Sequence, residues 1–94
     1  MGVGHYKKSI SSGILSESSR ILEGEGWLNG AILTGGGVDA KVIFYDSADE
    51  DLGDALEVGF VSQEVPFFNF AVHCVYGIYA QVDEGAEFMV LFDK

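Results

Sequence analysis

The segment that best predicts the fold is DAKVIFYD, residues 39–46, which lies between a glycine cluster and an acidic run. Its β-branched and aromatic residues favour a strand over a helix. Alternate side chains of a strand point to opposite faces. One face of this strand would hold Ala40, Val42 and Phe44, and the other Lys41, Ile43 and Tyr45. Because both faces are largely apolar, we expect a central strand and not a solvated edge.

The segment before it, Trp27–Thr34 (WLNGAILT), is typical of a second strand. Gly35–Gly37 separate the two segments, and glycine adopts positive φ without steric cost. We therefore expect a hairpin across these glycines. A phosphate-binding loop is the alternative. The sequence does not favour it, because no Lys-Ser or Lys-Thr pair follows and no helix is expected to begin there.

Two further runs predict strands in the middle of the chain. Asp54–Ser62 (DALEVGFVS) alternates with a period of two. Val65–Val72 is apolar, with Pro66 at its start, where a missing N–H is tolerated. In the first of these strands, one face is expected to hold Leu56, Val58 and Phe60.

The C-terminal part of the chain predicts a second hairpin. Val75–Asp83 (VYGIYAQVD) and Ala86–Asp93 (AEFMVLFD) alternate as strands, and Glu84-Gly85 between them suits a tight turn. The last strand is apolar on both faces, which implies a neighbour that covers it. We therefore expect an interface with another subunit at Phe88, Met89, Val90, Leu91 and Phe92.

The length of the chain and its alternation of short apolar runs with turn residues together predict one small all-β domain. A chain of 94 residues argues for a single domain. Six to eight short strands suffice for a small antiparallel β-sandwich or a jelly-roll-like barrel, which we assign to residues 14–94. Residues 1–13 (MGVGHYKKSISSG) are rich in Gly and Ser and predict an N-terminal arm that a neighbour holds in place. Lys7 and Lys8 of this arm are further interface candidates.

The chain is strongly acidic, with a formal net charge of −10. This charge repels nucleic acid and anionic membranes and attracts a basic partner or a cation, although it also serves solubility alone. Apolar residues make up 48% of the chain and seven residues are Phe, so we expect another chain to cover part of the apolar surface. The single cysteine excludes a disulfide within the chain.

The sequence contains no recognisable catalytic pattern, and we expect a protein that is not an enzyme and uses no cofactor. His73 and Cys74 are adjacent, so on a strand they point to opposite faces, and we expect Cys74 to be a buried apolar residue. One cysteine and two histidines match no zinc-site spacing. The serines at 9–19 lack a G-x-S-x-G pattern and are expected in loop and edge strand. Paired carboxylates for glycoside hydrolysis stay open, but so small a domain leaves little room for a cleft.

The acidic segment after residue 45 has two interpretations. Its carboxylates are Asp46, Asp49, Glu50, Asp51 and Asp54. Such a cluster suits Ca²⁺, but the spacing does not match an EF-hand, and we expect a solvated loop with at most one short helical turn. If the loop binds Ca²⁺ and Trp27 stacks on a sugar, the chain is a Ca-assisted carbohydrate-binding or receptor-binding module, our alternative function. Otherwise Trp27 is expected in the core.

The order of these segments resembles that of the small β-rich virion proteins of tailed bacteriophages. The likeness covers about residues 27–92 and rests on a YDS strand end, a glycine-containing loop and a late GIYA-x-V-x-x-G-A segment. The matching positions are Tyr45, Asp46, Ser47, Gly77, Ile78, Tyr79, Ala80, Val82, Gly85 and Ala86. The acidic composition of residues 46–54 has no counterpart in that pattern.

This resemblance implies a capsid decoration (cement) protein, a structural component of the virion. It implies a homo-oligomer, with a trimer favoured, that binds the major capsid protein on the outer surface of the capsid. Proteins of this kind carry no catalytic residues, so the resemblance transfers none to this chain.

Overall fold

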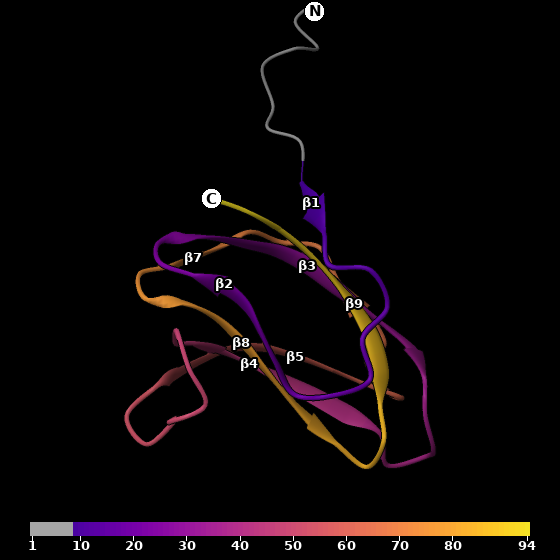
Figure 1. Ribbon diagram of the computed structural model, residues 1–94. Helices are drawn as coiled ribbons and strands as arrows, with labels where there is room; N and C mark the ends of the chain where they lie inside the picture. Colours follow the sequence, from indigo (N-terminus) through magenta and orange to yellow (C-terminus); the bar gives the residue numbers. More distant parts are fainter. Residues whose placement is uncertain (1–8) are drawn as a thin grey trace, which may run out of the picture.

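Nine short strands form the regular structure of residues 9–94, the part of the chain that the computed structural model describes (Figure 1). In chain order they are β1 (Ile10–Ser11), β2 (Ser19–Glu23), β3 (Gly26–Gly35), β4 (Lys41–Asp46), β5 (Leu56–Ser62), β6 (Phe67–Phe68), β7 (Val72–Cys74), β8 (Gly77–Asp83) and β9 (Glu87–Asp93). None of these residues forms a helix of the length and apolarity that crossing a bilayer requires.

The strands form two antiparallel sheets, which confirms the expected β-sandwich. Sheet A has the order β1-β9-β3-β6, and β7 also pairs with β3. Sheet B has the order β2-β8-β4-β5. The strand count exceeds the expected six to eight because Val65–Val72, expected as one strand, contributes to two short strands that both pair with β3.

The core lies between the two sheets and centres on Phe44 of β4. Its ring meets the rings of Phe68 and Phe88 edge to face, with centroids 6.0 Å apart in both pairs. The other large side chains that are fully buried are Leu28, Val42, Val61, Cys74, Ile78 and Val90. Strand β4 pairs with β5 on one side and β8 on the other, so the expected central strand is confirmed.

Both expected hairpins are wrong. Strand β3 lies in sheet A and β4 in sheet B, while β8 lies in sheet B and β9 in sheet A. The glycine-bearing turns reverse the chain, but each carries it from one sheet to the other. The two turns touch, because a Cβ on Gly36 (φ +123°) would lie 2.6 Å from Cβ of Ala40 and 3.1 Å from Cα of Ala86. Turn residues specify that the chain reverses, but not which strand pairs with which. Because the chain passes from one sheet to the other at each turn, the apolar faces of successive strands meet across the core.

Strand β5 presents a different face from the one expected. Its pairing with β4 shifts at Val58, which is left as the extra residue of a β-bulge. The bulge adds one residue and so reverses the alternation of faces along the strand. Val61 is therefore fully buried, whereas Leu56 and Phe60 are 69% and 38% exposed. Of the three residues expected to share one face, Val58 alone packs against the core.

Sheet A begins earlier in the chain than expected. Ile10 lies opposite Phe92, and the N–H of Ser12 donates to the carbonyl oxygen of Val90 at 2.9 Å. Residues 10–12, which the sequence assigned to the arm, thus belong to the edge of sheet A. Lys7 and Lys8 lie outside the described residues.

Candidate functional site

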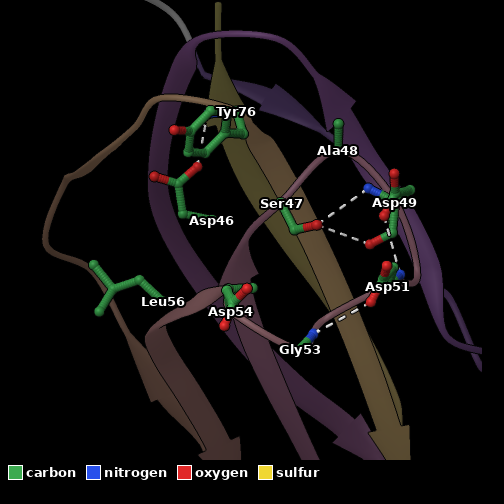
Figure 2. Close-up of a pocket in the computed structure, with 10 residues that line it drawn as sticks. Asp46, Ser47, Ala48, Asp49, Asp51, Gly53, Asp54, Leu56 and Tyr76 are labelled. Carbon is green, nitrogen blue, oxygen red and sulfur yellow. Dashed lines mark hydrogen bonds between the residues drawn. The ribbon is translucent and has the colours of Figure 1, made fainter.

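The acidic loop, residues 47–55 between β4 and β5, borders an open pocket of about 580 Å³ (Figure 2). The residues that line it are Asp46, Ser47, Ala48, Asp49, Asp51, Gly53, Asp54, Ala55, Leu56 and Tyr76. Leu56 and Tyr76 are strongly exposed and stand on the side of the pocket away from Asp49 and Asp51. Asp46 lies on the same side as Leu56 and Tyr76, so acidic groups border the pocket on both sides and the apolar side chains stand among them.

Asp46, at the end of β4, holds the turn between β7 and β8 in place through hydrogen bonds. Its Oδ2 accepts a hydrogen bond from the N–H of Val75 at 2.9 Å, and its Oδ1 accepts from the N–H groups of Tyr76 at 2.8 Å and Gly77 at 3.3 Å. A carboxylate that accepts three backbone N–H groups neutralises donors that would otherwise lack partners. The role that the geometry gives Asp46 is structural.

The rest of the acidic loop is held by its own side chains. The hydroxyl of Ser47, which is buried, donates to the carbonyl oxygen of Asp49 at 2.9 Å and accepts from its N–H at 3.2 Å. Oδ1 of Asp49 accepts from the N–H of Asp51 at 3.0 Å, and Oδ1 of Asp51 accepts from the N–H of Gly53 at 3.4 Å. Short side chains that bind the backbone two residues ahead form Asx-type turns. These bonds give the loop its shape.

Three of the five carboxylates proposed for Ca²⁺ bind backbone N–H groups in different segments of the chain. Asp46 binds the β7–β8 turn, while Asp49 and Asp51 bind the loop backbone. Among residues 9–94, no three His, Cys, Asp or Glu side chains gather in an arrangement that could hold a metal ion. Calcium binding by this loop stays a prediction.

His73 and Cys74 point to opposite faces of β7, as the sequence predicted. Cys74 is fully buried in the core. Burial, and secondarily the negative charge of Asp46, raise the pKa of its thiol from 9.0 to about 11, so it is protonated at neutral pH. His73 is on the surface, where its Nε2 lies 2.6 Å from Oε2 of Glu25 and its ring lies 4.9 Å from that of Trp27.

The expectation that Trp27 belongs to the core is wrong. Trp27 is 39% exposed and lies opposite His73 and Asp93, on the outer face of sheet A. The reason is register: Leu28, the next residue of β3, takes the inward position and is fully buried.

The outer face of sheet A carries an apolar surface that no other part of the described chain covers. It consists of Trp27, Ile32, Phe67, Met89 and Leu91, which we call the apolar face. Phe67, Ile32 and Met89 lie side by side across β6, β3 and β9. Phe67 is 60% exposed and Ile32 is 40% exposed. Directly opposed residues of an antiparallel pair share a face, so these side chains form one continuous row.

A hollow of about 240 Å³ lies within the apolar face. Its lining is almost entirely apolar and consists of Ala31, Ile32, Phe67, Phe68, Asn69, Met89 and Leu91. Its volume exceeds the roughly 150 Å³ of an apolar protein cavity that accepts benzene. One aromatic or large aliphatic side chain of another molecule would fit.

The structure corrects the set of β9 residues expected at an interface. Phe88 and Val90 are fully buried, and Phe92 is 9% exposed, so these three side chains belong to the core of their own chain. Met89 and Leu91 point outward and belong to the apolar face. Sequence reasoning missed the contribution of Ile32 and Phe67, which the spacing of apolar residues alone could not place on the same face as β9.

The outer face of sheet B has a different character. Ile43 lies between Phe60 and Gln81, and Nζ of Lys41 lies 5.2 Å from the centre of the Phe60 ring. The hydroxyl of Tyr45 donates to Oε1 of Gln81 at 3.4 Å. Polar and charged side chains therefore interrupt the apolar ones on this face, and each sheet has its own kind of surface.

Comparisons with known proteins give no family for this chain, so its function is argued from its residues. No protein-family model matches this chain, and neither the curated proteins nor the solved structures include a match.

Proposed function

We propose that this protein is a structural subunit, without catalytic activity of its own, that attaches to a protein assembly through the apolar face. The observation that carries the proposal is the row of Phe67, Ile32 and Met89 on sheet A, which nothing in residues 9–94 covers. A continuous exposed apolar surface with a hollow is typical of a protein–protein contact, because water solvates it poorly.

In the setting that the resemblance implies, the assembly is a bacteriophage capsid. The protein is then a capsid decoration (cement) subunit that binds the major capsid protein on the outer surface of the virion. A small sandwich with one neutral apolar face and an acidic remainder suits this role. The apolar face supplies the contact, while the net charge of −10 keeps the rest of the subunit in water and away from nucleic acid and anionic membranes.

The test is co-sedimentation with purified shells of the phage that encodes the protein, prepared without it. Leu91→Glu places a charge on the apolar face, and Phe60→Glu places one on the outer face of sheet B. Both residues are 38% exposed, so the two variants are matched. We expect Leu91→Glu to weaken binding by about tenfold or more and Phe60→Glu to leave it nearly unchanged. Absence of binding by the unaltered protein, or equal effects of the two variants, would contradict the proposal.

A second candidate, the Ca-assisted carbohydrate-binding or receptor-binding module, is favoured by the exposure of Trp27 beside His73 and Glu25. An exposed aromatic ring next to hydrogen-bonding groups suits a sugar. Titration of Trp27 fluorescence with soluble glycans, with and without Ca²⁺, tests it. A saturable change that requires Ca²⁺ supports this function, and an emission that no glycan alters rejects it.

A further inference from the structure

Charge distinguishes the apolar face from the rest of this acidic molecule. Two copies with a net charge of −10 repel each other, so a surface for self-association must keep carboxylates apart. The centre of the apolar face is uncharged. Along β9, the acidic residues Glu87 and Asp93 lie at the two ends, with Met89 and Leu91 between them. A basic partner would be drawn instead to the acidic surfaces, whereas the uncharged centre lets two acidic copies meet without opposing carboxylates.

The shape of the apolar face is that of a knob beside a hole. Phe67, at 60%, is more exposed than Trp27, Ile32 or Leu91 of the same face. It is one of the residues that line the 240 Å³ hollow, which has room for a phenyl ring. A surface that carries both a projecting ring and a cavity of matching size is complementary to itself when rotated by a two-fold axis.

From charge and shape together, we propose that a second copy of this chain covers the apolar face, in a two-fold dimer that inserts Phe67 of each copy into the hollow of the other. The inference rests on the proposed function, because both take the apolar face as a protein–protein contact. The second copy and the capsid protein use the same surface, so a subunit leaves the dimer before it binds a shell. It differs from the trimer that the resemblance implies.

The exposed area limits the strength of this dimer. Large aromatic side chains bury roughly 150–250 Å² each, so the five side chains of the apolar face expose on the order of 400 Å² per copy. Together with the polar rim, two copies bury about 1,000 Å², near the lower limit for a specific interface. We therefore expect a reversible dimer with a dissociation constant in the micromolar range.

Sedimentation velocity on the full chain, from low micromolar to roughly millimolar concentration, tests the dimer. Phe67→Ala removes the knob and Leu91→Glu charges the rim of the hollow. Each should weaken dimerisation by about tenfold or more, while the matched Phe60→Glu should not. Because these side chains are exposed, circular dichroism should show an unchanged fold for all three variants.

The salt dependence of binding distinguishes a second copy of the chain from a basic partner. Raising the salt concentration from about 0.05 M to about 0.5 M screens the repulsion between two acidic copies. We expect the dimer to tighten severalfold, whereas a complex with a basic protein would weaken.

Three outcomes overturn the inference: a monomer at all concentrations, an oligomer indifferent to Phe67→Ala and Leu91→Glu, and an oligomer that dissociates as salt rises. A trimer would overturn the two-fold arrangement. If the chain is a monomer yet binds shells in a manner that depends on Leu91, the dimer fails and the proposed function stands.

Discussion

The acidic loop and the apolar face are the two surfaces that the sequence offers for binding, and they differ in whether their groups already have partners. Asp49 and Asp51 of the loop, and Asp46 just before it, all accept hydrogen bonds from backbone N–H groups of the same chain. On the apolar face, the side chains of Phe67, Ile32 and Leu91 stay in contact with solvent. The comparison shows that a concentration of charge and a lack of intramolecular partners are separate properties of a surface, and our proposal rests on the second.

The largest expected effect contrasts the two faces of β9. Phe88→Ala leaves a cavity beside Phe44 and should lower the free energy of unfolding by about 3–5 kcal/mol. Leu91→Ala, on the apolar face, should lower it by less than about 1 kcal/mol in a monomeric sample. Urea denaturation of the two variants at low protein concentration measures both. Similar decreases in the free energy of unfolding for the two variants would mean that Leu91 is a core residue, and would contradict the difference between the two faces of β9.

The next effect contrasts two carboxylates of the acidic segment. Asp46→Ala leaves the N–H groups of Val75, Tyr76 and Gly77 without their acceptor, and should cost about 1–3 kcal/mol of stability. Asp54→Ala changes an exposed side chain and should cost no more than about 0.5 kcal/mol. Thermal unfolding measures the pair. If Asp54→Ala proves the more damaging, the structural role of Asp46 is wrong.

The last effect is absent at neutral pH and appears only in alkali, and it concerns the thiol beside Asp46. Because folding raises the pKa of Cys74 from 9.0 to about 11, the protonated thiol is favoured in the folded state. This contribution to the free energy of unfolding is complete below pH 9 and is lost as the pH rises through 11, about 3 kcal/mol in total. Denaturation between pH 8 and 11 should show a weaker pH dependence for Cys74→Ala than for the unaltered chain. Equal pH dependence would contradict the assignment.

The sequence predicted the local structure well and the pairing of strands poorly. β-branched and aromatic runs located β3, β4, β5, β8 and β9 within a few residues, because strand propensity is a local property. The hairpins failed because a turn at Gly36 or Gly85 is compatible with either the same sheet or the opposite one. Which partner a strand takes depends on the packing of both sheets, which no short segment contains.

The candidate site was predicted in part for the same reason. Two-sided apolar patterning identified β9 as a strand with an outward apolar surface, and Met89 and Leu91 do point outward. The contribution of Phe67 and Ile32 depends on β6 and β9 flanking β3, which is a feature of the topology. The bulge at Val58 likewise has no sequence signature that an alternating pattern reveals.

Trp27 offers the most direct test of the central claim, because it is the only tryptophan in the chain and lies on the apolar face, 39% exposed. Its emission and its quenching by acrylamide should be measured as the protein is concentrated and as shells are added. If the apolar face is an interface, the emission moves to shorter wavelength and quenching falls as the assembly forms. A Trp27 that stays equally accessible to acrylamide while the chain demonstrably assembles would contradict the account.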